Sequence, residues 1–364
     1  MKILNLIWKY GTGGIPKCFE TYSKLGEFDP SVDVKSVCID PQCFNYDRSK
    51  FTKLGIVCIK TKNQYDMSWH SALADMIRSY TPDVIFTHGF HGPMIYLITK
   101  IIHHLHVPLI ASYHGLYYAP TKNKKWIAPL INQLTMCMYK HCCERIVAVS
   151  YYSKRELEKH GIKGDKVCVV HNGIHDIPIK DGHKGKNDSV NIGVVSRLDP
   201  FKGIDILIDA LAEVKKRTNS KIKLDIVGNG PMDVSIKERV RQKGLDNEVR
   251  LLGYRSDVSE MMKEWDVFCL PTFFENHSLA ILEAMRAGKA IVTTDVGGNS
   301  ESVTNKMEAL LVPAHDVDNL SDALIKVVND EVLRNFLGKN ARERFEREFT
   351  EDKMKTDLIK ALTL

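Results

Sequence analysis

The chain has 364 residues, of which 44% are hydrophobic and 26% charged, and its formal net charge at pH 7 is +6. This composition is that of a globular protein large enough for two or three domains, and it excludes an intrinsically disordered chain. The lysines are dispersed and no nucleic-acid-binding motif occurs, so we expect no nucleic-acid partner. The first apolar run is too short for a signal peptide and no run reaches the length of a membrane span, so we expect a cytoplasmic protein.

The charge is unevenly divided along the chain. Residues 1–186 hold 25 Lys and Arg against 15 Asp and Glu, whereas residues 187–364 hold 26 against 30. Two interpretations remain open: the first half meets an anionic partner, such as a membrane surface or a phosphorylated acceptor, or it carries an ordinary solvated basic surface. The nine cysteines are scattered through predicted strands and helices, which favours reduced core thiols over a disulfide framework.

Short apolar runs alternate with helix-like segments in the first half, which predicts a parallel sheet covered by helices on both faces. The predicted strands are residues 1–8, Asp33–Ile39, Gly55–Lys60, Asp83–Thr87, Pro108–Tyr113, Arg145–Val149 and Lys166–Val170. A turn containing Gly13 and Gly14 follows the first of them and precedes a helix, where backbone N–H groups can approach a phosphate. It is not the dinucleotide fingerprint, because Pro16 occupies the position of the third glycine.

A second alternating series follows the polar segment 181–189, which we interpret as a linker. Its predicted strands are Val190–Ser196, Lys223–Val227, Val249–Leu252, Asp266–Leu270 and Ala290–Thr294. We therefore expect an α/β protein with two doubly wound domains, residues 1–180 and 181–349, and a ligand site in the cleft between them. The last amphipathic stretch is interrupted near residues 349–352, so a C-terminal helix, about residues 350–364, is expected to pack back on the first domain.

Two carboxylates, Glu275 and Glu283, flank the start of a short predicted helix that Ser278 caps and Gly288 ends. Glu275 follows the strand Asp266–Leu270, and anions bind where a strand leads into a helix N-terminus. The pair could be the acid and base of a glycosidase. We set that alternative aside, because the phosphate-binding candidates around the pair would then have no purpose.

Basic and glycine-rich segments follow the neighbouring strands. Arg197 and Lys202 flank the entry to a predicted helix, so a guanidinium and an ammonium converge where a diphosphate fits, unless they are one ordinary loop arginine and one solvated lysine. His114 ends the strand Pro108–Tyr113, where it either hydrogen-bonds a substrate hydroxyl or is structural. Turns that would line the same crevice are Gly228-Asn229-Gly230-Pro231 and Gly253-Tyr254.

A metal site is not expected. Cys137, His141, Cys142 and Cys143 crowd one predicted helix without the paired spacing of zinc ligands.

The ordered set of these motifs resembles the retaining glycosyltransferases of glycosyltransferase family 4, group 1, which have the GT-B fold. The matching motifs are Ser196-Arg197-Leu198 with Lys202-Gly203, Gly228-Asn229-Gly230-Pro231, Leu252-Gly253-Tyr254, Pro271-Thr272, Glu275-x7-Glu283 and Gly297-Gly298-x-x-Glu301. The resemblance implies two Rossmann-like domains facing a cleft, with the acceptor on the first domain and a nucleotide-sugar donor on the second.

The resemblance also implies a role for each matching residue of the second domain. Glu275 would hold hydroxyls of the donor sugar and Glu283 the ribose, while Arg197 and Lys202 would bind the diphosphate and stabilise it as it leaves. The Tyr254 segment would frame the base. The remaining donor-binding residues would be Gly228, Asn229 and Gly230 in their turn, and Asn276 with the backbone amides of His277, Ser278 and Leu279.

Three residues of the first domain would complete the site: Gly13 and Gly14 would reach the donor phosphates, and His114 would contact the sugar. Asn276 and His277 depart from the family pattern, which has a small residue and then an aromatic after the first glutamate. A side-chain contact from His277 to sugar or phosphate is therefore a further hypothesis.

The implied function is transfer of a hexose or N-acetylhexosamine from a nucleotide-diphospho-sugar, expected to be UDP-linked, to a glycan or polyprenyl-diphosphate-linked acceptor in surface polysaccharide or glycoconjugate biosynthesis. No metal or other cofactor is expected, because Arg, Lys and a helix N-terminus neutralise the leaving group. The alternatives are a GT-B nucleotide-sugar epimerase and a non-catalytic sugar-nucleotide-binding subunit of a glycan assembly complex.

Residues 117–130 interleave basic and aromatic side chains. This stretch is either an ordinary surface loop leading to a helix or a segment that docks on an anionic bilayer or a lipid-diphosphate acceptor. The second interpretation would place the protein peripherally on the inner face of the membrane.

Overall fold

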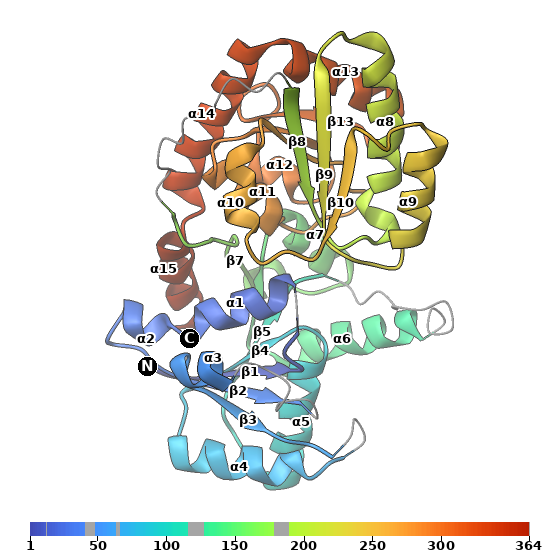
Figure 1. Cartoon of the computed structure of the whole chain (residues 1–364). Helices are drawn as coiled ribbons and strands as arrows, with labels where there is room; N and C mark the ends of the chain where they lie inside the picture. The colour runs from blue at the N-terminus through green and yellow to red at the C-terminus, as the bar shows by residue number, and fades with distance from the viewer. Residues whose placement is uncertain (12, 41–47, 63–65, 116–126, 178–188, 364) are drawn as a thin grey trace. The chain divides into compact units, whose positions relative to one another are not determined.

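The structure is a computed structural model, and it describes every residue except 12, 41–47, 63–65, 116–126, 178–188 and 364. The chain forms two compact units (Figure 1). Unit 1 comprises Met1–Asn172 and Glu351–Leu364, and unit 2 comprises Gly173–Thr350. The boundary expected between residues 180 and 181 lies outside the described residues, and unit 2 begins ahead of it.

Unit 1 is built on a seven-stranded sheet in the order β3-β2-β1-β4-β5-β6-β7, in which every neighbouring pair is parallel. Its strands are β1 (Lys2–Trp8), β2 (Asp33–Ile39), β3 (Ile56–Ile59), β4 (Val84–His88), β5 (Leu109–Tyr113), β6 (Arg145–Ala148) and β7 (Val167–Val169). All seven strands predicted in this half exist, with ends that agree or differ by one residue.

Helices cover both faces of this sheet. They are α1 (Gly14–Tyr22), α2 (Leu25–Phe28), α3 (Arg48–Lys53), α4 (Trp69–Tyr80), α5 (His91–His103), α6 (Ala128–Cys142), α7 (Tyr151–Lys159), the 3-10 turn η3 (Gly164–Lys166) and α15 (Glu351–Leu362). The C-terminal helix α15 buries Met354 and Leu358 in the same cluster as Cys18 and Tyr22 of α1, on one face of the sheet.

Unit 2 is built on a six-stranded parallel sheet in the order β10-β9-β8-β11-β12-β13. Its strands are β8 (Ser189–Val195), β9 (Lys221–Val227), β10 (Val249–Gly253), β11 (Val267–Leu270), β12 (Ala290–Thr294) and β13 (Ala309–Val312). Its helices are η4 (Pro200–Lys202), α8 (Ile204–Arg217), α9 (Asp233–Gln242), α10 (Val258–Glu264), α11 (Leu279–Arg286), α12 (Asn299–Ser302), α13 (Val317–Asn329) and α14 (Glu331–Glu348).

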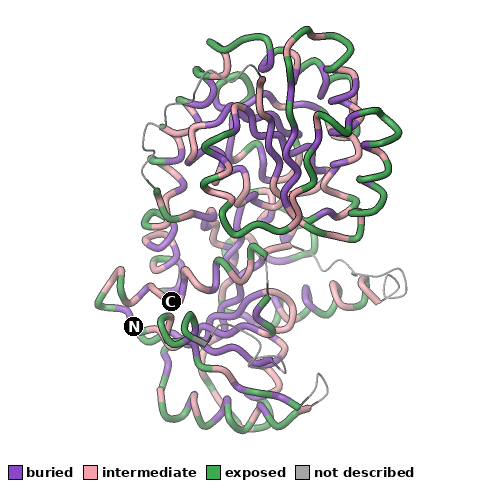
Figure 2. Tube along the Cα trace, viewed as in Figure 1, coloured by how far each residue is buried: buried purple, intermediate pink, exposed green. Residues whose placement is uncertain are grey.

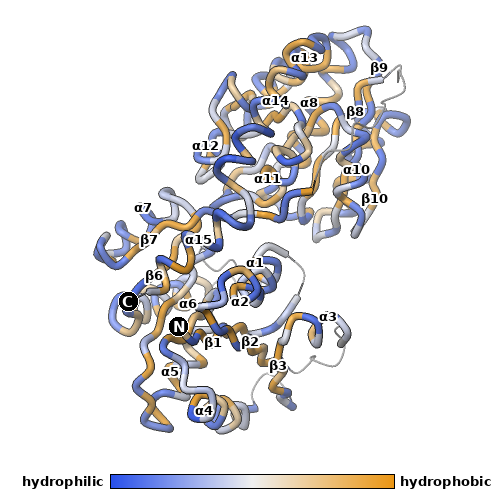
Figure 3. Tube along the Cα trace, turned by 90° about the vertical axis from the view of Figure 1, so that its left-hand side faces the viewer, coloured by the Kyte–Doolittle hydropathy of each residue, from blue (hydrophilic) through white to orange (hydrophobic). Residues whose placement is uncertain are grey.

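The strands of both units are buried while the helices are buried on one side only (Figure 2). Strand β12, for example, is buried along its whole length, as expected of a parallel strand covered on both faces. Hydrophobic and hydrophilic residues alternate along helices such as α13 (Figure 3), which turns Leu320, Leu324 and Val327 to the core. Each unit is therefore a doubly wound α/β layer structure, as the alternation in the sequence predicted.

The strand order reverses direction once in each sheet. In unit 1 the reversal lies between β1 and β4, and in unit 2 it lies between β8 and β11. Ligands of open α/β sheets bind at this point, outside the carboxyl ends of the two strands. The loops after β8 and β11 are those that carry Arg197, Lys202 and Glu275.

The cysteines differ in part from expectation. Seven of them are free thiols, as predicted: Cys18, Cys38, Cys137, Cys142, Cys143, Cys168 and Cys269. Cys58 is disulfide-bonded, so the prediction of reduced thiols is wrong at this position.

Candidate functional site

Lys202 and Glu275 meet at the strand-order reversal of unit 2. Lys202 ends the turn η4 after β8, Glu275 lies in the loop after β11, and the Lys202 Nζ is 2.6 Å from the Glu275 Oε2. The two side chains are only 16% and 18% exposed, so solvent screens their interaction weakly. The ammonium also lies 5.4 Å from the centre of the Phe201 ring. The two residues belong to separate sequence motifs, and the fold brings their side chains together as an ion pair.

Backbone contacts fix the loop that carries Lys202. Gly203 has φ 66°, in the left-handed region, and a Cβ at this position would lie 2.1 Å from the carbonyl oxygen of Pro271. The amide of Phe273 donates a 2.7 Å hydrogen bond to the carbonyl of Phe201, and the Thr272 hydroxyl donates to the same oxygen at 3.1 Å. Only glycine allows this close approach, which ties the Lys202 loop to the segment leading to Glu275.

A second glycine turn fixes Glu275 from the other side. The amide of Gly298 donates to the carbonyl of Glu275 at 3.0 Å, and a Cβ on Gly297 would lie 1.8 Å from that same oxygen. Asn299, which is fully buried, donates from its Nδ2 to the Thr294 carbonyl at 3.1 Å and so anchors the turn to β12. The Gly-Gly pair therefore has a positioning role, which the motif alone did not reveal.

The Gly228-Asn229-Gly230 turn supports the segment that carries Arg197. The amide of Leu198 donates to the Asn229 carbonyl at 3.0 Å, and a Cβ on Gly228 would lie 1.8 Å from the Ser196 carbonyl oxygen. A Cβ on Gly230 would likewise lie 2.4 Å from the Leu198 carbonyl oxygen. The contacts of these glycines are therefore with protein backbone.

Arg197 presents its guanidinium to solvent. Its side chain is 64% exposed, and its Nε forms an ion pair with Asp199 Oδ2 at 3.2 Å. A cation held this loosely remains available to an anionic ligand.

Helix α11 begins next to Glu275. Ser278 caps it with a hydroxyl that accepts from the amide of Ile281 at 3.4 Å, as the sequence predicted. Leu279 is its first residue, and Glu283 lies one turn further along. The positive end of the helix dipole therefore adjoins the Lys202–Glu275 pair. Asn276 is half-buried between Glu275 and the cap.

The His277 ring turns into the protein. The side chain is 4% exposed, its Nε2 lies 3.3 Å from the Ser302 hydroxyl, and its ring centre is 5.5 Å from that of Phe349. The hypothesis of a side-chain contact to sugar or phosphate does not fit this burial. The structure leaves the backbone of His277 as the part that adjoins the helix N-terminus.

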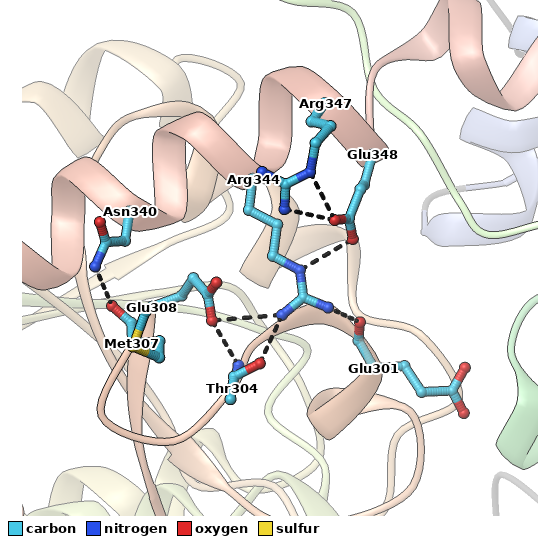
Figure 4. A network of polar contacts seen from close by, with 8 residues as sticks. All are labelled: Glu301, Thr304, Met307, Glu308, Asn340, Arg344, Arg347 and Glu348. Carbon is cyan, nitrogen blue, oxygen red and sulfur yellow. Dashed lines mark hydrogen bonds and ion pairs between the residues drawn. The ribbon is translucent and has the colours of Figure 1, made fainter.

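A polar network centred on Arg344 supports the same region from α14 (Figure 4). Its Nη2 donates to the Glu301 carbonyl at 2.9 Å, and its Nη1 donates to the Thr304 hydroxyl at 3.0 Å. Its Nε donates to Glu348 at 3.0 Å, and its guanidinium carbon lies 5.8 Å from the Phe349 ring centre. Since Glu301 belongs to α12, which follows Gly298, the network fixes the far end of the turn that holds Glu275.

Tyr254 follows β10, the edge strand of the unit 2 sheet, and its side chain is 66% exposed. An exposed aromatic ring at a strand end is suited to contact a flat ligand group.

The glycine turn of unit 1 is held differently. Gly13 has φ 128° and lies at the N-terminus of α1, and a Cβ there would meet no atom within 4 Å. Gly14 is the first residue of α1. Ahead of the turn, the backbone amide of Tyr10 donates a hydrogen bond to the Oδ2 of Asp40 at 3.2 Å. Open space around Gly13 is compatible with a ligand phosphate approaching the backbone.

His114 follows β5 in a desolvated polar cluster. Its Nε2 lies 2.9 Å from the Ser112 hydroxyl, and burial lowers its pKa to about 4. The ring centres of His88 and His114 lie 5.9 Å apart. Burial and, to a lesser extent, repulsion from His114 lower the pKa of His88 well below its usual value. His88 Nε2 lies 2.7 Å from Asn5 Oδ1, while the Asn5 Nδ2 donates to the Phe19 carbonyl and the Ser36 hydroxyl. Both histidines are therefore neutral near pH 7.

Three further predictions concern the basic and aromatic stretch 117–130, a metal site and a membrane span. Residues 116–126, most of the basic and aromatic stretch, are outside the described residues, but Leu130 and Leu134 of α6 are exposed at one-turn spacing. Within the described residues, no group of three or more His, Cys, Asp or Glu side chains could hold a metal ion. Over the same residues, no helix combines the length and the apolar character needed to cross a bilayer.

Comparison with known proteins agrees with this geometry. Residues 177–344 match the family described as glycosyl transferases group 1, and residues 40–176 match Glycosyltransferase Family 4. The chain is 27% identical over 313 residues to the UDP-Gal:alpha-D-GlcNAc-diphosphoundecaprenol alpha-1,3-galactosyltransferase of Escherichia coli, covering 82% of this chain and 79% of that protein. It is 28% identical over 214 residues to an uncharacterized glycosyltransferase of Methanocaldococcus jannaschii, covering 58% of this chain and 56% of the relative's length.

The fold also matches solved structures. The structure of HepE from Anabaena in complex with UDP superposes with a TM-score of 0.83 at 19% identity, over the full length of both chains. The two sheets, the order of their strands and the family matches agree with one another. The chain therefore belongs to the group 1 glycosyltransferases of glycosyltransferase family 4, and its two Rossmann-like units are those of the GT-B fold.

Proposed function

We propose that this protein transfers a hexose or N-acetylhexosamine from a UDP-linked sugar, with retention of configuration, to a glycan or polyprenyl-diphosphate-linked acceptor in surface polysaccharide or glycoconjugate biosynthesis. The observation that carries the proposal is the Lys202–Glu275 ion pair beside the N-terminus of α11. A buried cation, a helix N-terminus and a carboxylate within one site suit a ligand that joins a diphosphate to a sugar.

The relatives support the choice of donor and acceptor. The E. coli relative is named for a UDP-galactose donor and a diphosphoundecaprenol-linked acceptor, and HepE has been crystallised with UDP and with UDP-glucose. A further relative, from Staphylococcus aureus, is named as a poly(ribitol-phosphate) alpha-N-acetylglucosaminyltransferase. Donor sugars thus vary within the family, so the assay must include several.

Each site residue has a role in the proposed reaction. Lys202 and Arg197 bind the diphosphate and stabilise its charge as the bond from the anomeric carbon to the phosphate oxygen breaks. Glu275 holds sugar hydroxyls, and Glu283 holds the ribose. The acceptor oxygen bonds to the anomeric carbon from the same face, and its proton passes to the departing phosphate oxygen. No protein base or metal is required for that transfer.

In the protein without bound donor, the ion pair preorganises the site. Each partner holds the other in place, so neither charge is buried without a counter-charge. When the donor binds, phosphate oxygens take over the Lys202 interaction and sugar hydroxyls that of Glu275. The site is thereby preorganised for a ligand with an anionic and a hydroxylic end. From unit 1, Gly13, Gly14 and His114 are proposed to contact the donor.

The test is nucleotide release from UDP-glucose, UDP-galactose and UDP-N-acetylglucosamine, measured with and without a lipid-diphosphate-linked sugar. We expect slow hydrolysis of one donor by the wild-type protein and faster release with acceptor. Lys202→Ala should lower the rate about 100- to 1,000-fold. The control is Lys216→Ala, which removes an exposed lysine paired with Glu213 and should leave the rate unchanged.

Other outcomes identify the alternatives. Nucleotide release that never depends on acceptor, with a change in the stereochemistry of the released sugar, would indicate the epimerase. Binding of a nucleotide sugar without turnover would indicate a non-catalytic subunit.

Peripheral membrane association is part of the proposal. The exposed Leu130 and Leu134 of α6, with Lys140 exposed further along the helix, are compatible with an anionic bilayer surface. We expect co-sedimentation with anionic liposomes that falls when Lys122, Lys124 and Lys125 become Glu. Binding that does not change in that variant would refute this part of the proposal.

A further inference from the structure

An aromatic stack with an exposed histidine adjoins the Lys202–Glu275 pair. The rings of Phe273 and His315 face each other with centres 3.6 Å apart and an interplanar angle of 29°. Phe273 lies two residues before Glu275, and its Cε1 is 3.0 Å from the position that a Cβ on Gly203 would take, directly after Lys202. Phe273 therefore lies on the loop of Glu275 and against the loop of Lys202, while His315 comes from the loop between β13 and α13.

The backbone of His315 adopts a conformation that side chains rarely take. Its φ is 62°, in the left-handed region, which costs a residue with a Cβ free energy. The next residue, Asp316, caps α13 by accepting from the amide of Asn319 at 2.9 Å, which holds the turn in place. His315 itself is exposed, so burial in the core does not repay the strain. Strain of this kind at a ligand site points to a function for the ring.

The strand order shows which part of a ligand the stack would meet. The edge strands of the sheet are β10, which precedes Tyr254, and β13, which precedes His315. The ion pair follows β8 and β11, between those edges. A donor whose base lies near Tyr254 and whose sugar lies at Glu275 extends from the β10 side toward the β13 side. The acceptor meets the donor sugar at its anomeric carbon, and a ring of the acceptor can extend from there to the β13 side of that sugar.

The chemistry of the stack suits a sugar. One face of the imidazole covers Phe273, and its other face is available to the apolar C–H face of a pyranose. The ring nitrogens can donate to or accept from hydroxyls at the rim of the same sugar. This combination of a flat apolar surface with polar atoms at its edge is the complement of a carbohydrate ring.

We propose that Phe273 and His315 form a stacking subsite for a sugar ring of the acceptor, so that the acceptor presents a saccharide rather than a bare lipid phosphate or a simple alcohol. This inference rests on the proposed glycosyltransfer. It assigns acceptor recognition to a residue of unit 2, in addition to whatever unit 1 contributes.

The experiment has a binding arm and a turnover arm. In the first, saturation-transfer difference NMR measures binding of lactose, maltose and N,N′-diacetylchitobiose to the full chain in the presence of UDP. In the second, UDP release from the three UDP-sugars is measured without acceptor. The test variant is His315→Asn, because asparagine tolerates the left-handed region but has no ring. The control is Lys306→Gly, which removes the side chain from another left-handed position, φ 64°, in the same unit.

We expect at least one saccharide to bind the wild-type protein, and His315→Asn to weaken that binding about 3- to 10-fold, the range of an aromatic stacking contact. The control should bind as the wild type does, and hydrolysis of the donor should be the same in all three proteins. The inference is wrong if no saccharide binds the wild type, if His315→Asn binds normally, or if its donor hydrolysis changes instead. Absence of hydrolysis with every UDP-sugar would count against the proposed function, whatever the binding arm shows.

Discussion

The candidate ligand sites of the two units are held in place by different interactions. In unit 2, the loops with Lys202 and Glu275 are locked by backbone hydrogen bonds and by glycines whose missing side chains allow contact with a carbonyl. In unit 1, His114 is placed by side chains in a desolvated polar cluster, and a Cβ on Gly13 would meet no atom of the described residues within 4 Å. Backbone locking requires glycine at fixed spacing, which leaves a motif in the sequence, whereas a side-chain cluster leaves none.

Because the two sites are held in place differently, they should respond differently to substitution and to pH. A carbonyl in contact with a glycine cannot retreat without moving its loop, so substitutions there act on geometry. A desolvated histidine responds to protons, so the site in unit 1 should respond to pH. Pairs of variants that change the same type of residue, one at the site and one away from it, can therefore test this difference.

The largest effect is expected from a double-mutant cycle on the ion pair of unit 2. Lys202→Ala and Glu275→Ala should each lower kcat/KM about 100- to 1,000-fold, and the double variant should be no worse than roughly tenfold below either one, because the two residues act as a unit. The cycle is measured as UDP release. A matched cycle on the exposed pair Lys216 and Glu213 should show no coupling. Losses that multiply in the first cycle would show that the pair does not act on one ligand.

The next effect comes from adding a methyl group to a glycine turn. Gly297 and Gly244 have φ 55° and 63°, but a Cβ on Gly297 would lie 1.8 Å from the Glu275 carbonyl oxygen, whereas one on Gly244 would meet no atom within 4 Å. Gly244→Ala should lower the free energy of unfolding by about 1 kcal/mol without loss of activity. Gly297→Ala should lower it by about 2 to 4 kcal/mol and activity about 100-fold, because Glu275 moves.

Chemical denaturation and UDP release measure the two consequences separately. Equal activity in the two alanine variants would contradict the positioning role of the Gly-Gly turn, even if their stabilities differ.

Much of the fold could be predicted from the sequence because parallel strands covered on both faces are continuous apolar runs. The run Ala290–Thr294 was predicted with its observed ends. Strand β13, Ala309–Val312, was not predicted, because four apolar residues before a proline do not distinguish a strand from a turn. The break before α15 was visible because the amphipathic pattern is interrupted there, and α14 ends at Glu348.

The site was predictable to the level of motifs and no further. The spacing of the motifs identified Glu275 and Lys202 as candidate site residues. Their ion pair depends on the strand order, which could not be predicted from these motifs. The burial of His277 depends on Phe349, 72 positions away, so it could not be read from the residues beside it. The backbone conformation of His315 was also not predicted, since a single histidine before a helix cap does not by itself indicate the left-handed region.

For unit 1, the prediction concerns pH. The folded-state pKa of His114, about 4, is below the ordinary value of 6.5, so the unfolded chain binds more protons between these values. The contribution of His114 is fully present above pH 6.5 and is lost as pH falls from 6.5 to 4, by at most about 3 kcal/mol. His114→Asn should therefore reduce the slope of the free energy of unfolding against pH in that interval.

Chemical denaturation at several pH values gives the slope, and the NMR titration of the His114 ring gives its pKa directly. The control is His160→Asn, the same substitution at an exposed histidine at the end of α7. An ordinary pKa for His114 would remove the contrast between the units, because neither site would then depend on a desolvated side chain.

The smallest effect tests whether the locking of unit 2 extends to α14. Arg344→Met removes the hydrogen bonds to the Glu301 carbonyl and the Thr304 hydroxyl, whereas Arg347→Met removes only an exposed contact to Glu348 (Figure 4). We expect Arg344→Met to lower the free energy of unfolding by about 1 to 2 kcal/mol and to raise the donor KM about 2- to 3-fold, since the turn holding Glu275 loses its far support.

Arg347→Met should change the free energy of unfolding by less than about 0.5 kcal/mol and leave the KM unaltered. Because both residues lie on one helix and both contact Glu348, their difference reports the contacts that only Arg344 makes, to Glu301, Thr304, Glu308 and the Phe349 ring. A loss of stability in Arg344→Met without any change in KM would confine the locking to the two glycine turns. The Arg344 network would then stabilise the fold of unit 2 without positioning its site.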